Sequence, residues 1–206
     1  MRDRLPKRPQ GRRICIICEG DEDFDYIQRL RELRVWSNKY SIVPRNAGSI
    51  DNIFSRYQIE YQVDDNELVV IFCDTDDSYA TLKQNIEEFH DKQVANYLIY
   101  YANPCTMQIF LSHFSKGISL KTADKSKNSP LIKKLTGVEE YRATEQQRKH
   151  INKKISPENY VEMKNNIEPL RKKTYTDVPS SNFYNLLVNL ESDETSWIDE
   201  INNYLD

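Results

Sequence analysis

The chain has 206 residues, with 29 basic and 32 acidic side chains, a formal net charge of -3 and 38% hydrophobic residues. This composition builds a hydrophobic core and excludes a disordered or fibrous protein. No apolar run reaches the length of a signal peptide or a membrane-spanning helix. We therefore expect a cytoplasmic protein that has no membrane partner and keeps its cysteines reduced.

The first half alternates between short apolar runs and helical periodicity. Strands are predicted over 13–18, 40–43, 68–73 and 96–101, and helices over 21–33, after the N-cap Ser49 and over 78–90. Apolar strands separated by helices are typical of a parallel sheet covered on both faces. The predicted fold class is α/β, with a Rossmann-like parallel sheet of about four strands flanked by helices and followed by a helical C-terminal region.

From Pro104 onward the pattern is helical. Helices are predicted near 104–114, 128–136, 139–154, 158–173, 181–191 and 195–205, and the polar segment 116–129 is predicted to be a mobile loop. The expected organisation is a basic N-terminal arm (1–12), an α/β core (13–115) and a helical extension packed on that core (116–206). Oligomeric state does not follow from these patterns.

Carboxylates follow two of the predicted strands directly. Glu19 comes after the first strand, and Asp74 and Asp76 come after the strand 68–73. The carboxyl ends of parallel strands meet at one sheet edge, so we expect these three side chains to converge there as catalytic and metal-binding residues. Such a site suits Mg²⁺ or Mn²⁺ as the cofactor. Asp77 is expected to support the metal, and Gly20 to permit a tight turn beside the substrate.

Other acidic and sulfur side chains receive structural interpretations. Asp21, Glu22 and Asp23 stand in the first turn of a predicted helix, where negative charge stabilises the helix dipole. Cys15 and Cys18 have half of a zinc-binding spacing, but residues three apart in a strand point to opposite faces. We interpret both cysteines as buried apolar residues.

The two acidic motifs also resemble a known family. Glu19-Gly20 and Asp74-Thr75-Asp76 resemble the TOPRIM fold of topoisomerases, primases and overcoming-lysogenization-defect (OLD) nucleases. The order of CEGDEDFDYI, FCDTDD, Asn103-Pro104-Cys105 before IFLSHF, and PSSNFYNLL, spanning residues 13 to 190, resembles RloB-like proteins, which are found beside restriction and phage-defence genes. The resemblance implies a Mg²⁺-dependent nuclease acting on DNA or RNA, and a partner protein such as an ATPase.

One position departs from the RloB-like pattern. Members of that family carry an acidic residue two positions after Asn-Pro-Cys, where this chain has Met107, followed by Gln108. Either Gln108 or His113 binds the metal in place of that acidic residue, or the site binds nucleic acid without cutting it. Asn103 and His113 are candidate substrate contacts, and for His113 a hydrogen-bonded core role is the alternative.

Basic residues are the candidate contacts to a polynucleotide. Residues 115–154 hold eleven Lys or Arg against four acids, although the whole chain is slightly acidic. The lysines that follow the helix near the acidic edge are predicted to bind phosphate groups: Lys116, Lys121, Lys125 and Lys127. The alternative is that they form an ordinary solvated face.

Two other functions stay open at this stage. An apolar strand that ends in Asp-x-Asp also occurs in haloacid-dehalogenase-type phosphatases, where Asp74 would be the nucleophile and Asp76 the acid. Against this, the motif follows the third strand here, and no later acidic pair follows an apolar strand. The other alternative is a degenerate, non-catalytic TOPRIM module that regulates a partner or binds nucleic acid, and Met107 favours it.

Overall fold

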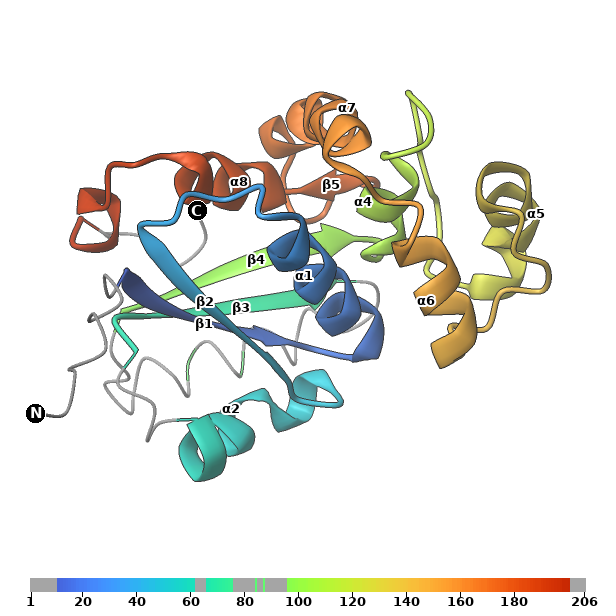
Figure 1. The fold of residues 1–206 in the computed structure, drawn as a ribbon. Helices are drawn as coiled ribbons and strands as arrows, with labels where there is room; N and C mark the ends of the chain where they lie inside the picture. The colour runs from blue at the N-terminus through green and yellow to red at the C-terminus, as the bar shows by residue number, and fades with distance from the viewer. Residues whose placement is uncertain (1–10, 62–65, 76–83, 85–86, 88–95, 201–206) are drawn as a thin grey trace, which may run out of the picture.

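The computed structural model describes residues 11–61, 66–75, 84, 87 and 96–200 (Figure 1). Its centre is a five-stranded sheet in the order β2-β1-β3-β4-β5. The strands are β1 (Arg12–Cys18), β2 (Tyr40–Asn46), β3 (Leu68–Asp74), β4 (Tyr97–Asn103) and β5 (Ser180–Ser181). The first four are mutually parallel, and β5 pairs with β4 in the antiparallel direction. The predicted α/β class is confirmed, with one more strand than expected.

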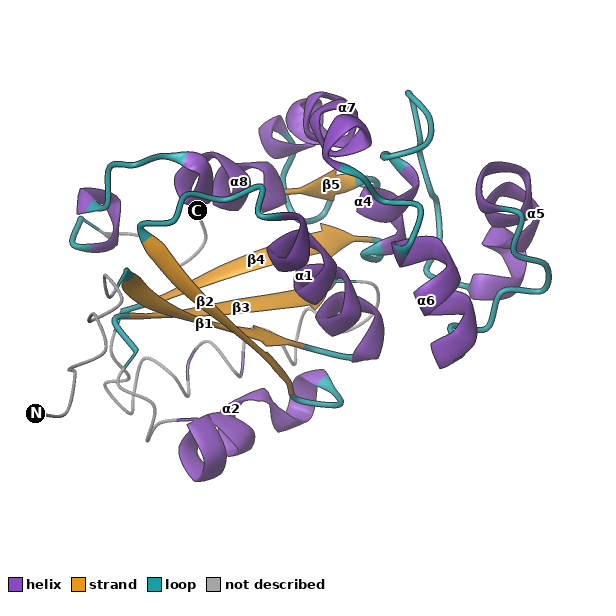
Figure 2. Cartoon of the chain, in the orientation of Figure 1, coloured by secondary structure: helices purple, strands orange, loops and turns teal. Residues whose placement is uncertain are grey.

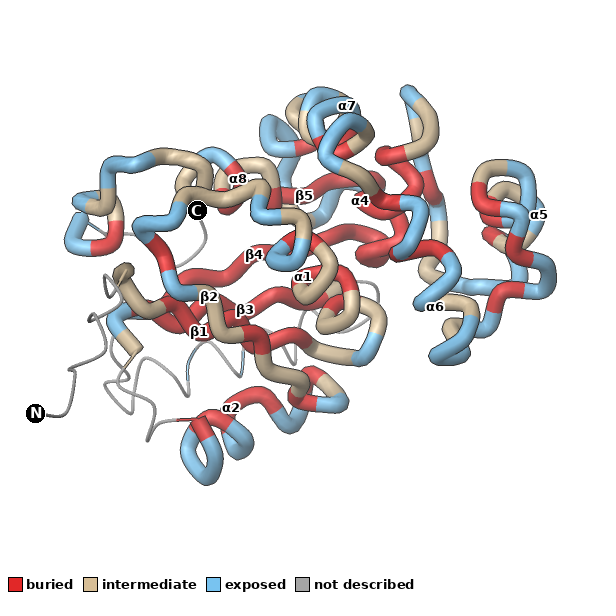
Figure 3. The backbone as a smooth tube through the Cα atoms, in the orientation of Figure 1, coloured by how far each residue is buried: buried red, intermediate tan, exposed pale blue. Residues whose placement is uncertain are grey.

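Strand residues alternate between two hydrophobic cores, as the two-residue period of a strand requires. In β1, Ile14, Ile16 and Cys18 belong to one core, and Cys15 and Ile17 belong to the other. The sheet is therefore buried on both faces, which Figure 3 shows as red strands between the helical layers. The opposite orientations predicted for Cys15 and Cys18 are confirmed, and both thiols are buried and free.

Helix α1 (Asp21–Leu33) covers the face of the larger core, and its bounds agree with the prediction. Tyr26, Ile27 and Leu30 form its buried stripe, each fully inaccessible, and burying such a side chain contributes about 1.5–3 kcal/mol. The opposite face is covered by a segment of changing helical type, visible below the sheet in Figure 2: η1 (Ile50–Asn52), α2 (Ile53–Arg56) and the π-helical η2 (Tyr57–Tyr61).

The second half adds helices around the ends of the sheet. They are α4 (Met107–Leu111), α5 (Lys125–Thr136), α6 (Glu145–Asn152), α7 (Pro157–Ile167), η3 (Glu168–Lys172), α8 (Phe183–Glu191) and η4 (Ser196–Ile198). Figure 1 shows α5 and α6 beyond the carboxyl ends of the parallel strands. This position brings a part of the chain that is remote in sequence to the edge where Glu19 and Asp74 lie.

Strand β5 was not expected, because Ser180–Ser181 is short and polar. The Ser181 hydroxyl donates to the carbonyl of Tyr101 at 2.6 Å. The side chain of Asn182 then accepts from Tyr101 N–H at 2.8 Å and donates to the carbonyl of Ile99 at 2.9 Å. A side-chain amide thus continues the hydrogen-bonding pattern of a strand, and it anchors the start of α8 to β4.

The predicted loop 116–129 is wrong over its second part. Helix α5 starts at Lys125, because the Asp124 carboxylate accepts the N–H of Ser126 at 2.9 Å and caps the helix. The predicted helix 78–90 lies outside the described residues except at Gln84 and Glu87, both of which are helical. Within the described residues, no helix is long and apolar enough to cross a membrane.

Candidate functional site

A cavity of about 400 Å³ opens at the carboxyl ends of β1 and β3. One wall is acidic and consists of residues 19–23 and Asp74, with residues 105–107 beside them. The opposite wall comes from Ala123, from Lys125, Asn128 and Ile132 of α5, from residues 141–143, and from Arg148 of α6. The cavity therefore joins the predicted acidic edge to the basic segment of the second half.

Glu19 and Asp74 lie next to each other, as their positions after neighbouring parallel strands predict. The N–H of Glu19 donates to the carbonyl of Phe72 at 3.0 Å, which extends the pairing of β1 with β3 by one residue. The N–H of Asp74 in turn donates to Oε2 of Glu19 at 3.0 Å. Backbone hydrogen bonds of the sheet thus hold both side chains at the mouth of the cavity.

Thr106, in the turn before α4, orients the Asp74 carboxylate. Its N–H donates to Oδ1 of Asp74 at 2.7 Å, and its hydroxyl donates to the same oxygen at 2.8 Å. Thr106 is only 2% exposed, so water does not compete for these bonds. Thr106 is a residue of the candidate site that the sequence interpretation missed, because an isolated Thr after Asn-Pro-Cys carries no pattern of its own.

Asp23 is the third carboxylate of the cavity, and its predicted role as a helix-dipole residue is incomplete. Its Oδ2 accepts the N–H of Gly20 at 3.2 Å, which caps α1. Its Oδ1 is buried without a hydrogen-bond partner among the described residues, and the side chain is 4% exposed. The nearby Thr106 hydroxyl has one proton, which it donates to Asp74. A buried carboxylate oxygen without a donor is costly unless it is protonated or binds a cation.

The carboxylates raise one another's pKa values. Burial and the charges of Glu19 and Glu22 raise the pKa of Asp23 from 3.8 to about 7, and the hydrogen bond from the Gly20 N–H acts in the other direction. Burial and the charges of Asp23 and Glu19 raise the pKa of Asp74 well above its usual range. These shifts show an electronegative site whose charge only a cation or protons can offset.

The donor set fits a hard divalent cation. Every candidate donor among Glu19, Asp23 and Asp74 is a carboxylate oxygen, and Mg²⁺ prefers one or two carboxylates completed by water and phosphate oxygens. Within the part of the chain that the structure describes, no group of three or more His, Cys, Asp or Glu side chains has the geometry to hold a metal alone. The predicted ligands Asp76 and Asp77 lie outside the described residues.

Several other predicted site residues have structural roles. The chain bends at Gly20, but the backbone there is extended with φ of -140°, and a Cβ would meet nothing within 4 Å, so this bend does not require a glycine. Asn103 donates to the carbonyl of Tyr175 at 2.7 Å. Gln108, a suggested replacement ligand, donates to Ile118 O at 2.8 Å and accepts from Leu120 N at 2.9 Å. Met107 lines the cavity.

His113 does not line the cavity. It is 1% exposed, and its ring contacts the hydroxyl of Tyr26 at 2.9 Å and Oδ1 of Asn159 at 3.1 Å. Burial lowers the pKa of His113 to about 4, although the hydrogen bonds with Asn159 act in the other direction. These contacts favour the alternative of a neutral, hydrogen-bonded core residue that joins α1 to α7.

Of the four predicted lysines, Lys125 is the one that lines the cavity, where its ammonium pairs with Glu22. Tyr141 donates to the other oxygen of Glu22 at 2.7 Å. Lys121 lies 3.4 Å from the carbonyl of Val178, and Lys127 pairs with Asp124 at 3.7 Å. Lys116 is exposed and does not line the cavity.

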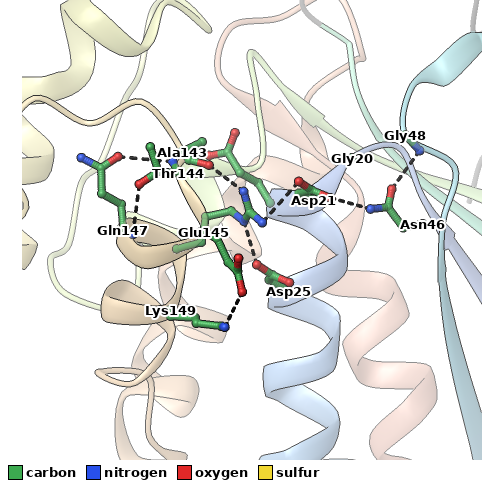
Figure 4. Close-up of polar contacts among 12 residues, drawn as sticks. Gly20, Asp21, Asp25, Asn46, Gly48, Ala143, Thr144, Glu145, Gln147 and Lys149 are labelled. Carbon is green, nitrogen blue, oxygen red and sulfur yellow. Dashed lines mark hydrogen bonds and ion pairs between the residues drawn. The ribbon is translucent and has the colours of Figure 1, made fainter.

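The cavity wall opposite the carboxylates is basic, with Lys125, Arg142 and Arg148, and Arg148 anchors this basic wall to α1. Its guanidinium contacts Asp25 at 2.7 Å and Asp21 at 3.3 Å, and it donates to the carbonyl of Ala143 at 2.6 Å. Figure 4 shows Asp21 and Asp25 of α1 facing the segment of Ala143 and Thr144 across these contacts. The Arg148 side chain is 11% exposed, so these contacts are largely shielded from water.

Comparisons with known proteins do not identify a family. No protein-family model, no curated protein and no solved structure matches the chain.

Proposed function

We propose that this protein is a Mg²⁺- or Mn²⁺-dependent hydrolase of the TOPRIM class that cuts phosphodiester bonds in DNA or RNA. The observation that carries the proposal is the unpartnered, buried Oδ1 of Asp23, which lies in one cavity with Glu19 and Asp74. Three mutually repelling carboxylates at the carboxyl edge of a parallel sheet lower stability, and a divalent cation offsets that cost. The motifs Glu19-Gly20 and Asp74-Thr75-Asp76 support the assignment to the TOPRIM class.

In this proposal each residue has a separate task. Glu19 and Asp74 hold the cation, Asp23 holds it directly or through water, and Asp76 and Asp77 complete the ligand set. Thr106 keeps the Asp74 carboxylate in one orientation through two hydrogen bonds. When bound, Mg²⁺ supplies Lewis-acid chemistry that polarises the phosphoryl group and makes water a stronger nucleophile. The opposite wall of the cavity, which carries Lys125, Arg142 and Arg148, then has to bind the negatively charged polynucleotide next to the carboxylates.

The test is cleavage of labelled DNA and RNA by the purified protein with Mg²⁺, Mn²⁺ or EDTA. We expect cleavage that depends on the metal and is lost in Glu19→Gln and Asp74→Asn. The matched control is Asp51→Asn, an exposed acid of the segment that covers the opposite face of the sheet, which should leave cleavage unchanged. Equal cleavage by all four proteins, or cleavage in EDTA, would refute the proposal.

The same assay separates the two alternatives. A haloacid-dehalogenase-type phosphatase would release phosphate from a small ester such as p-nitrophenyl phosphate and leave polynucleotides intact. A degenerate TOPRIM module would bind polynucleotides and cut nothing, and Met107 is the feature that favours it. Glu19 and Asp74, which share one hydrogen bond at the cavity mouth, favour a site that still binds metal.

The resemblance to RloB-like proteins also leads to a proposal for the cellular role of the protein. It favours a role in phage defence or beside a restriction system, with a partner protein such as an ATPase. A cytoplasmic location fits this role and fits the four buried, free thiols.

A further inference from the structure

The wall that faces the carboxylates contains three cations, and they differ in how they are used. Arg148 is committed to Asp25, Asp21 and a backbone carbonyl. Lys125 pairs with Glu22, but its side chain remains 46% exposed, and an ammonium has two further protons to donate. These two residues hold α5 and α6 against α1 and leave part of the positive charge facing the cavity.

Arg142 is the third cation of this wall, and its side chain does not hold the described elements together. Its N–H donates to Oε1 of Gln147 at 2.8 Å, which fixes the backbone at this point. Its guanidinium makes no hydrogen bond or ion pair with any residue that the structure describes, although the residue lines the cavity and is exposed. Five N–H donors in a planar fork match the oxygens of a phosphate group.

A second hollow, of about 460 Å³, adjoins the first. The two share Lys125, Tyr141 and Arg142 in their linings. A flexible chain that starts at the carboxylates therefore passes Lys125 and Arg142 before it reaches the second hollow. Asp124, the N-cap of α5, and Glu140 also line this hollow, and their carboxylates make it a poor site for a second phosphate.

The size of both hollows limits what enters them. Volumes of 400 and 460 Å³ lie near the lower end of the roughly 300–1,000 Å³ that is usual for small-molecule pockets. This is the size class of one or two nucleotides, and two paired strands do not fit. A nucleotide that enters a pocket of this size has to leave a duplex first, at a cost of a few kcal/mol for unpairing and unstacking.

We propose that the two hollows bind a single-stranded polynucleotide or its unpaired end, with the phosphate next to the scissile bond held between Lys125 and Arg142. This inference rests on the proposed function and names its substrate class. One nucleotide occupies the cavity beside the carboxylates, and its neighbour occupies the second hollow. A duplex has to unpair before one of its strands enters, since the wall of α5 and α6 stands opposite the acidic residues.

The test measures binding separately from cutting. A labelled single strand and a hairpin duplex are titrated in Ca²⁺ at several salt concentrations, with wild type and with Lys125→Ala/Arg142→Ala. The matched control is Lys134→Ala/Lys172→Ala, which removes the same charge at exposed positions outside both hollows. Circular dichroism and melting temperatures show whether all variants fold.

We expect wild type to prefer the single strand by at least about tenfold, since the duplex has to unpair first. The Lys125/Arg142 variant should bind at least about tenfold more weakly, with a salt slope reduced by about 0.7 for each lost phosphate contact. The control variant should bind like wild type. Equal losses in both variants, tighter binding of the duplex, or no binding by wild type would overturn the inference.

Cleavage by the same proteins in Mg²⁺ distinguishes the two proposals. If wild type binds single strands through Lys125 and Arg142 but never cuts, this inference holds and the proposed hydrolase is wrong. If wild type cuts duplex as well as single strands, and the Lys125/Arg142 variant cuts equally well, the hydrolase stands and this inference is wrong.

Discussion

The N–H of Asp74 donates a hydrogen bond of 3.0 Å to Oε2 of Glu19, and this bond joins the residues that follow β1 and β3. A backbone donor beside two carboxylates fixes their separation whether or not a cation is bound. The fold therefore preorganises the site, and the cost of crowding the charges appears as raised pKa values at Asp23 and Asp74.

The first prediction concerns Asp23. Its pKa in the folded protein, about 7, lies above the ordinary 3.8, so between these values the folded state binds more protons than the unfolded state. The contribution of Asp23 to the free energy of unfolding is fully present below about pH 4 and is lost as pH rises through 7. Asp23→Asn removes the charge, and we expect it to stabilise the metal-free protein at pH 8 by up to about 4 kcal/mol.

Urea unfolding in EDTA at pH 4 and pH 8 measures this effect. The gain from Asp23→Asn should vanish at pH 4, and Asp51→Asn should show no such dependence. Added Mg²⁺ should stabilise wild type more than the variant, because the metal binds the folded state. A variant that is less stable than wild type at pH 8 without metal would contradict the assignment of Asp23 to a strained acidic site.

The second prediction concerns His113, whose pKa shift has the opposite sign. Its pKa in the folded protein, about 4, lies below the ordinary 6.5, so the unfolded state binds the proton first. Stability should fall by up to about 3 kcal/mol as pH decreases from 6.5 to 4. His113→Gln should be less stable at pH 7, because it loses the contacts with Tyr26 and Asn159, but it should lose less stability in acid.

Free energies of unfolding at pH 4.5, 5.5 and 7 check this prediction. His150→Gln, an exposed position on α6, is the control and should follow the wild-type curve. An identical acid dependence in wild type and His113→Gln would show that His113 is not held neutral by burial.

Sequence patterns predicted the parts of the fold that depend on local periodicity. The strands β1 and β3 are apolar along nearly their whole length, and α1 has an apolar stripe, so their positions were visible. Strand β5 was not, because Ser180–Ser181 has no apolar pattern and Asn182 supplies the pairing through its side chain. The start of α5 was missed because its first turns are polar.

The site was predictable to a similar extent. Glu19 and Asp74 follow apolar strands, which placed them correctly. Asp23 was assigned to the helix dipole, although it lies four and seven residues before the buried Ile27 and Leu30 and therefore on the inner face of α1. That spacing was a usable signal. The excess of Lys and Arg in residues 115–154 predicted a basic surface, but it did not show that Arg148 anchors it, because the approach of Arg148 to Asp25 depends on tertiary packing.

The third prediction tests this packing. Arg148→Ala leaves Asp25 without its cation and frees the segment that carries Arg142, so we expect a loss of about 1–3 kcal/mol in stability and weaker binding of single strands. Lys149→Ala is the control, since its pair with Glu145 is exposed. Chemical unfolding and strand binding measure both effects. Equal stability of the two variants would mean that Arg148 does not anchor the wall.

The fourth prediction concerns Asn182. Replacing it with Ala removes two buried hydrogen bonds to β4, with Tyr101 and Ile99, and should cost about 2 kcal/mol or more. Asn189→Ala, on α8, is the comparison and should change stability less. Hydrogen exchange at the Tyr101 amide provides a local readout. Unchanged protection of that amide in Asn182→Ala would contradict the pairing role of this side chain.

The central claim is that the carboxylates at the ends of β1 and β3 bind a divalent cation. Anomalous diffraction from crystals grown with Mn²⁺ tests it most directly, with Asp74→Asn crystals as the comparison. We predict an anomalous peak in the cavity, with oxygens of Glu19 and Asp74 at about 2.0–2.2 Å, and no peak in the variant. A wild-type crystal grown with Mn²⁺ that has an empty cavity, or whose ion is bound away from Glu19 and Asp74, would contradict the account.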